Sequence, residues 1–90
     1  MSIVRIPQVL RAAAGGNKQL ELAGASVRDL VEGLVTEYPT LRGQLLTDDG
    51  ELNRFVNIYV NGQDVRYLDG LATPVGERDE VRLLPAMAGG

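Results

Sequence analysis

The stretch from Ser26 to Pro39, SVRDLVEGLVTEYP, decides the fold because it holds the strongest helix signal in the chain. Ser26 stands at the N-cap position and Asp29 follows three residues later, a carboxylate variant of the capping box. Pro39 disfavours helical geometry at the residue before it and ends the segment. The apolar residues recur at the spacing of one helical face: Val27, Leu30, Val31, Leu34, Val35 and Tyr38. We therefore predict one amphipathic helix, which must bury this face against a sheet.

Two alternating segments before the helix predict the first strands of that sheet. SIVRIP (2–7) places Val4 and Ile6 on one face, and KQLELAG (18–24) places Leu20 and Leu22 on one face. The connection through Gly15-Gly16 is typical of a turn, so we expect these strands to form an antiparallel hairpin.

The segments after the helix predict the rest of the sheet. TLRGQLL (40–46) is expected to form a short helical turn whose leucines cover one end of the core. RFVNIYVNGQDVRYL (54–68) is typical of a hairpin, because Asn61-Gly62 supplies the positive φ of a tight turn. VRLLP (81–85) closes the domain as a last strand. The order is strand, strand, helix, strand, short strand, strand, which predicts an α+β fold.

Composition limits what this domain can do. Ninety residues form one small domain, and a net charge of −3 argues against nucleic acid and anionic membranes as partners. The chain has no cysteine and no histidine, which removes disulfides, thiolate nucleophiles and the usual general base. We therefore predict no catalytic residues and no metal ligands, and we expect a carrier or substrate protein rather than an enzyme. No signal peptide is visible, so we expect a cytoplasmic protein without a membrane partner.

Two polar clusters are candidates for ligand sites, and neither has the required pattern. Asp48, Asp49 and Glu51 lack the ligand spacing of a calcium loop, and a solvated turn explains them better. Residues 15–18, GGNK, lead into a strand rather than a helix N-terminus, so they indicate a connecting turn and not a phosphate cradle.

The sheet face away from the helix is a candidate docking surface. Successive side chains alternate between the faces of a strand, so inward Val56, Ile58 and Val60 leave Tyr59 facing outward. Arg5 is expected to join this outer face. We predict a partner-docking surface made of Phe55, Tyr59, Arg82 and Leu84. The alternative that these residues merely cover the sheet stays open.

The last residues, LLPAMAGG (83–90), predict a second kind of contact. Residues 1–84 are expected to form the domain, and residues 85–90 an extended, flexible tail that reaches roughly 20 Å. Its slim or adaptable side chains suit a narrow channel in a partner: Pro85, Ala86, Met87, Ala88 and Gly89. The tail would deliver the α-carboxylate of Gly90, a poor electrophile that must first be activated. Attack on a nucleotide α-phosphate would give an acyl-adenylate that can accept sulfur as a thiocarboxylate.

The succession of elements and the LLPAMAGG ending resemble the ubiquitin-like sulfur carriers of the ThiS/MoaD family. Residues 54–90 and RIPQVLR (5–11) look most similar to the carrier used in thiocarboxylate-dependent cysteine synthesis. The resemblance implies a β-grasp (ubiquitin-like) fold with a mixed four- to five-stranded sheet and one main helix packed on one face. It also implies that Gly90 is adenylated and then thiocarboxylated, and that Tyr59 and Leu84 lie where such domains dock.

The resemblance also implies the partners. These are an E1-like adenylating enzyme that uses ATP and magnesium, a sulfur donor, and a pyridoxal-phosphate-dependent cysteine synthase that accepts the sulfur. A metal-dependent peptidase would release the product, and no cofactor is expected on the carrier itself.

Three alternatives stay open. The chain resembles the small subunit of molybdopterin synthase, whose acceptor is the large subunit; it also fits a protein modifier joined through Gly90 to lysines. A sheet that binds nucleic acid is disfavoured by the acidic balance.

Overall fold

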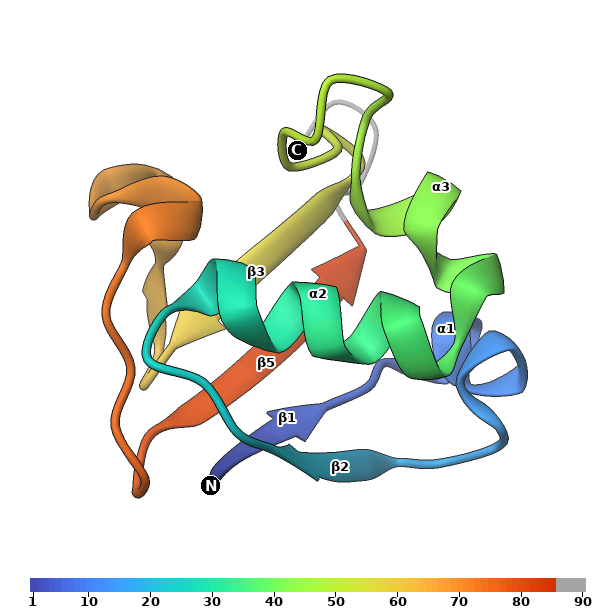
Figure 1. Ribbon diagram of the computed structural model, residues 1–90, viewed down its shortest axis with the longest axis horizontal. Helices are drawn as coiled ribbons and strands as arrows, with labels where there is room; N and C mark the ends of the chain where they lie inside the picture. Colours follow the sequence, from blue (N-terminus) through green and yellow to red (C-terminus); the bar gives the residue numbers. More distant parts are fainter. Residues whose placement is uncertain (86–90) are drawn as a thin grey trace.

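The computed structural model describes residues 1–85, and Figure 1 shows their strands behind one long helix. The described residues form a five-stranded sheet in the order β2-β1-β5-β3-β4. The strands are β1 (Ser2–Arg5), β2 (Gln19–Leu22), β3 (Val56–Val60), β4 (Gln63–Asp64) and β5 (Glu80–Pro85). The helices are α1 (Gln8–Arg11), α2 (Val27–Glu37) and α3 (Arg42–Leu45), with 3-10 turns at Ala12–Ala14, Pro39–Leu41, Val65–Tyr67 and Gly70–Ala72.

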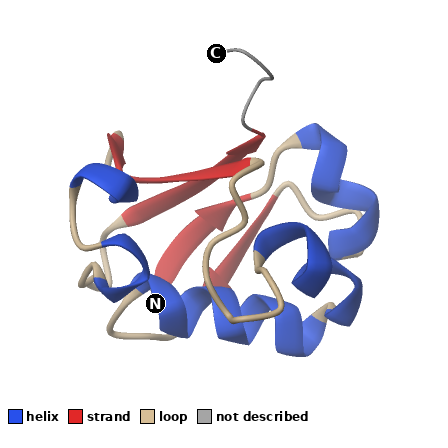
Figure 2. Cartoon of the chain, turned by 90° about the horizontal axis from the view of Figure 1, so that it is seen from above, coloured by secondary structure: helices blue, strands red, loops and turns tan. Residues whose placement is uncertain are grey.

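The sheet is mixed. β5 lies at its centre, parallel to β1 through Val4 and Val81 and antiparallel to β3 through Ile58 and Leu83. β1 also pairs antiparallel with β2, as the sequence predicted. Figure 2 shows α2 along one face of this sheet, with the opposite face open. The predicted β-grasp arrangement is confirmed.

Helix α2 follows the sequence pattern closely. The Ser26 hydroxyl accepts a hydrogen bond from the Asp29 amide at 3.3 Å, and the Asp29 carboxylate accepts one from the Ala25 amide at 2.9 Å. The first contact pairs an amide that a helix start otherwise leaves unpaired, and the second holds the residue before the N-cap against the first turn. Five of the six residues predicted from its period are buried: Val27, Leu30, Val31, Leu34 and Val35. The sixth, Tyr38, follows the helix as its C-cap and is only partly buried. The helix therefore turns its whole apolar face onto the sheet.

The core confirms the inward residues predicted on the strands. On β3 and β5 the side chains of Ile58, Val81 and Leu83 are at most 1% exposed. The leucines of the 40–46 segment are all buried: Leu41, Leu45 and Leu46. Leu20 and Leu22 of β2 are only partly buried, because β2 is an edge strand.

The connection between β1 and β2 is longer than the turn that Gly15-Gly16 predicted. It contains α1 and a 3-10 turn, which bury Leu10 and Ala14 one helical turn apart. Four residues are too few to show a helical period in the sequence, so α1 carries no recognisable signal. Its placement bends the chain away from the sheet immediately after β1.

Gly15 closes this connection and offers a test of its packing. It has φ 69°, and a Cβ placed there would lie 2.9 Å from Cε1 of Tyr38. Gly16 has φ 81°, but a Cβ added at this residue would meet nothing within 4 Å. Both alanine substitutions incur the left-handed backbone cost, about 1 kcal/mol, whereas only Gly15→Ala also meets the Tyr38 ring. We expect Gly15→Ala to lose about 2 kcal/mol in urea unfolding, and Gly16→Ala about half of that; equal losses would contradict the contact.

Candidate functional site

The central strand β5 leads directly into the predicted tail. It extends to Pro85, which lies opposite Val56 of β3, so the strand runs one residue beyond the predicted domain limit at Leu84. Pro85, assigned to the tail from the sequence, therefore belongs to the sheet. The other predicted tail residues lie outside the described part of the chain: Ala86, Met87, Ala88, Gly89 and Gly90. The C-terminal segment therefore follows from the central strand of the sheet, whose last residue is exposed.

The open face of the sheet brings three of the predicted docking residues together. Tyr59 on β3 pairs with Arg82 on β5, and Asn57 pairs with Leu84. Tyr59, Arg82 and Leu84 line one shallow hollow with Gly62 and Glu80. Leu84 is 37% exposed, in contrast to its buried neighbour Leu83. The alternation predicted from the sequence thus holds on both strands.

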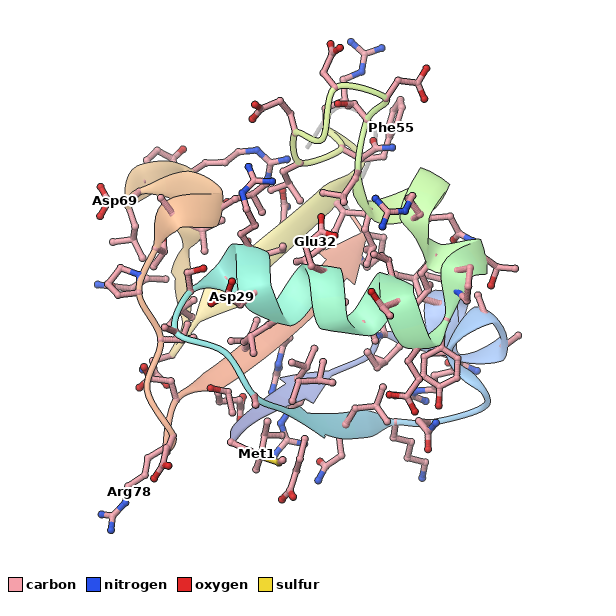
Figure 3. The ribbon with its side chains drawn as sticks, viewed as in Figure 1. Met1, Asp29, Glu32, Phe55, Asp69 and Arg78 are labelled. Atoms are coloured by element: carbon pink, nitrogen blue, oxygen red, sulfur yellow. The ribbon has the colours of Figure 1, made fainter. Side chains whose placement is uncertain are left out.

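Phe55 occupies a different hollow from Tyr59 and Leu84. It lies in the turn before β3, is 61% exposed, and its amide donates a hydrogen bond to Asn53 Oδ1 at 2.9 Å. Figure 3 shows it near the loop that precedes β3. Its hollow is lined by Val9, Leu10, Gln44, Asn53, Val56 and Pro85. The docking surface predicted as one patch is therefore divided into two hollows, and Pro85 lies at the second.

Sequence reasoning missed Arg66, which fixes the loop that carries Phe55. Its guanidinium donates to Asn57 Oδ1 at 2.7 Å, to the Val56 carbonyl at 2.8 Å and to the Asn53 carbonyl at 3.1 Å. An arginine in a hairpin sequence gives no signal for such contacts, because two of its three partners are backbone groups selected by the tertiary fold. Arg66 thus positions the start of β3.

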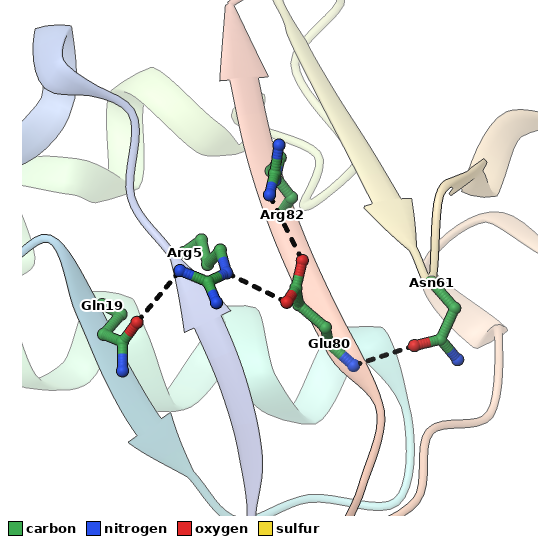
Figure 4. A network of polar contacts seen from close by, with 5 residues as sticks. All are labelled: Arg5, Gln19, Asn61, Glu80 and Arg82. Atoms are coloured by element: carbon green, nitrogen blue, oxygen red, sulfur yellow. Dashed lines mark hydrogen bonds and ion pairs between the residues drawn. The ribbon is translucent and has the colours of Figure 1, made fainter.

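A polar network crosses the open face between β2 and the β3–β4 turn (Figure 4). Arg5 Nε lies 3.0 Å from Glu80 Oε2, and Arg82 Nη2 lies 3.4 Å from Glu80 Oε1. Arg5 also donates to Gln19 Oε1 at 3.1 Å, and the Glu80 amide donates to Asn61 Oδ1 at 3.0 Å. The Arg5 guanidinium, with a smaller effect of Arg82, lowers the pKa of Glu80 against the opposing effect of burial. Glu80 is therefore ionised at neutral pH.

The neighbouring Asp79 is held by Asn61 of the β3–β4 turn and by Gly76 in the segment before β5. Asn61 Nδ2 donates to Asp79 Oδ1 at 2.9 Å and the Gly76 amide donates to Oδ2 at 2.7 Å. These two hydrogen bonds, that from Asn61 first, lower the pKa of Asp79. Because the pKa of Asp79 is lower in the folded chain than in the unfolded one, its ionised carboxylate stabilises the fold. This stabilisation is fully present above the ordinary carboxyl pKa and is lost as the pH falls through the lowered pKa of the folded chain.

Two features are absent from the described residues, a group of acidic side chains placed to hold a metal ion and a membrane-spanning helix. Across residues 1–85, no group of three or more acidic side chains is placed to hold a metal ion, and this includes the Asp48, Asp49 and Glu51 turn. The longest helix in the same range is α2 with 11 residues, and none there is long and apolar enough to cross a membrane. What the geometry offers is an exposed sheet face with shallow hollows and a central strand that ends at Pro85.

Comparisons with known proteins agree with this description. The profile of the ThiS family matches residues 4–90. A putative sulfur carrier protein of Archaeoglobus fulgidus is 51% identical over 87 residues, which cover 97% of this chain and 96% of the relative. The sulfur carrier protein CysO of Mycobacterium tuberculosis is 42% identical over 89 residues, with the same coverage of both chains.

Two solved structures have the same fold. The chain matches a structure of the Amycolatopsis orientalis BexX/CysO complex with a TM-score of 0.90 and 37% identity, over 100% of both chains. It matches the small archaeal modifier protein 1 of Methanosarcina acetivorans with a TM-score of 0.87 and 34% identity, over 99% of this chain and 95% of the other. The similarity therefore extends over the whole domain.

Proposed function

Because the chain belongs to the ThiS family, we propose that it is a sulfur carrier for cysteine biosynthesis, with Gly90 as the residue that bears the sulfur. The observation that supports this most strongly is its 42% identity to a CysO sulfur carrier over 97% of the chain. The central position of β5 supports it as well, since the strand supplies a fixed base from which a narrow tail can reach into another protein.

The chemistry takes place in the partner enzymes. A carboxylate oxygen of Gly90 attacks the α-phosphorus of ATP, which is bound with magnesium in the adenylating enzyme, and pyrophosphate leaves. A hydrosulfide equivalent then attacks the acyl carbon, and AMP leaves with the original carboxylate oxygen. The product is a thiocarboxylate at Gly90. In this scheme the carrier supplies only the carboxylate and the surface by which the enzymes recognise it.

The acceptor is proposed to be a pyridoxal-phosphate-dependent cysteine synthase, followed by a metal-dependent peptidase that releases cysteine from Gly90. A CysO structure solved as a complex with BexX shows that a similar carrier binds another protein. The open sheet face and the strand end at Pro85 are the surfaces we assign to such contacts.

Mass spectrometry of the intact protein tests the proposal. The carrier is incubated with the adenylating enzyme of its own organism, ATP, magnesium and sulfide, and the product is alkylated. We expect one alkylated species whose modification maps to Gly90. Alkylation is needed because oxidation of Met1 or Met87 changes the mass almost as much as exchange of oxygen for sulfur. A protein that remains unalkylated under these conditions would rule out the carrier role.

A second candidate function is protein modification, which the match to a small archaeal modifier protein favours. This function uses the same adenylated Gly90 but ends in an amide bond to a lysine of another protein. Digests of the host proteome would then contain lysines that carry remnants of the Gly89-Gly90 end. Their absence, together with the alkylated species, supports the carrier alone.

The open face is expected to bind the adenylating enzyme through Tyr59 and Leu84. Either alanine variant should weaken binding by about 1–2 kcal/mol, or roughly 5- to 30-fold in Kd, as for moderate truncations at an interface. Isothermal titration calorimetry measures this change. Tyr67→Ala is the control, because Tyr67 is 88% exposed and lines neither hollow. Equal binding of all three variants would show that the enzyme docks elsewhere.

A further inference from the structure

A third hollow on the molecule gathers positive charge on an otherwise acidic chain. It lies beside β5 and is lined by Arg5, Ile6, Pro7, Arg11, Lys18, Gln19, Arg82, Leu83 and Leu84. Four of the nine basic residues of the chain line this hollow, and none of the twelve acidic residues does. Its charge is therefore opposite to the net charge of −3.

The hollow exists because β1 leaves the sheet before β5 ends. The parallel pairing stops at Arg5 and Arg82, and the chain then turns at Pro7 into α1. Arg11 from α1 and Lys18 from the segment before β2 lie around the space this leaves. The Arg11 Nε donates to the Ile6 carbonyl at 3.1 Å, which fixes the guanidinium at the rim.

The positive charge of the hollow is only partly neutralised. Glu80 contacts Arg5 and Arg82 from the next outward position of β5. Within residues 1–85, Arg11 and Lys18 form no ion pair. One carboxylate thus contacts two of the four cations, and an anionic partner would gain charge-assisted hydrogen bonds from the other two.

The chemistry of the lining indicates which anion fits. Arginine forks match carboxylates in paired geometry, and the exposed side chain of Leu84 offers apolar surface beside them. Nucleic acid is disfavoured, because the charge forms one hollow rather than a stripe and the chain as a whole is acidic. We propose that this hollow binds an acidic segment of the adenylating enzyme and so orients the carrier before its tail enters the active site.

This proposal rests on the proposed function, because the adenylating enzyme that it assigns to the hollow is a partner only of a sulfur carrier. The hollow includes Leu84, one residue before the strand ends at Pro85. The hollow therefore adjoins the end of the strand after which the residues proposed to enter the enzyme begin. Electrostatic attraction at such a place raises the association rate more than it lowers the dissociation rate.

The test is the association rate with the adenylating enzyme of the same organism, measured by stopped flow at low and high salt. We expect Arg11→Glu combined with Lys18→Glu to slow association about tenfold or more at low salt and to flatten its salt dependence. Lys18→Glu alone is the second variant, because its change leaves the Arg11 contact with the Ile6 carbonyl intact. Its expected effect has the same direction and a smaller size.

The matched control reverses the charge of two arginines outside the hollow, Arg28 on α2 and Arg78 in the turn before β5. Arg28→Glu with Arg78→Glu changes the net charge by the same amount, and neither arginine lines the hollow. The control should associate within about twofold of the parent. Equal slowing of both double variants, or of neither, would overturn the proposal.

Two further measurements separate this proposal from binding of nucleic acid or phosphate at the hollow, and from the carrier role itself. Amide chemical shifts around the hollow are followed during titration with an octa-aspartate peptide, a single-stranded oligonucleotide and inorganic phosphate. Changes in the amide chemical shifts on addition of the peptide alone support the proposal. Larger changes with the oligonucleotide or phosphate than with the peptide overturn it. Thiocarboxylate formation is measured in parallel on the parent. A parent that binds the enzyme with the expected salt dependence but acquires no sulfur would refute the carrier role and still support the hollow.

Discussion

Deletion of Gly90 is expected to abolish sulfur loading while the free energy of unfolding stays within about 0.5 kcal/mol of the parent. The loading expectation follows from the proposed chemistry, in which the Gly90 carboxylate is the attacking group. The deletion moves the terminal carboxylate back by about 3.5 Å, the length of one extended residue. A misplacement of about 1 Å in an active site can already cost about 100-fold in rate. The stability expectation follows because the buried core is built from residues between Val4 and Leu83.

The measurement is the alkylated fraction after incubation with the adenylating enzyme, ATP, magnesium and sulfide. Gly90→Ala is the matched control, because it keeps the length of the chain and adds only a methyl group. We expect this variant to load more slowly than the parent but measurably, since a Cβ hinders close approach of the backbone without moving the carboxylate out of reach. Loading of the deletion variant at the parent's rate would show that Gly90 is not the sulfur-bearing residue.

The parts of the fold that the sequence predicts well are those with a repeated local pattern. Helix α2 repeats its apolar residues over three turns, and the capping contact of Ser26 and Asp29 is local. The alternation of β3 and β5 correctly separates Leu83 from Leu84. In each case neighbouring residues in the chain decide the outcome, so the pattern can be recognised without knowing the tertiary fold.

The parts that the sequence does not predict depend on residues far apart in the chain. Arg11 and Lys18 come together at one hollow only because α1 bends away from the sheet beside β5. Arg66 bonds to backbone groups ten or more residues away. The alternation predicts Phe55 beside Tyr59, but the turn before β3 interrupts it. Each of these features follows from long-range packing, which leaves no repeated signal in the sequence.

The second large effect is expected for Leu83→Ala on β5, and it is a loss in the free energy of unfolding. Leu83 is 1% exposed and pairs with Ile58, which is fully buried against the helix side of the sheet. Leu83→Ala removes three buried carbon atoms and leaves a cavity, a change that costs about 3–4 kcal/mol in comparable cores. For a domain of this size, whose total stability is roughly 5–13 kcal/mol, the melting temperature should fall by about 12 °C or more.

Leu84→Ala is the control for this change, because it removes the same atoms one position along the same strand. Leu84 is 37% exposed on the open face, so its loss should cost less than about 1 kcal/mol of stability. We expect its effect to appear instead in binding to the adenylating enzyme. Calorimetric melting of both variants separates the two expectations. If the two losses of stability were equal, β5 would not divide its side chains between the core and a binding face, and the assignment of Tyr59, Arg82 and Leu84 to a docking surface would lose its structural basis.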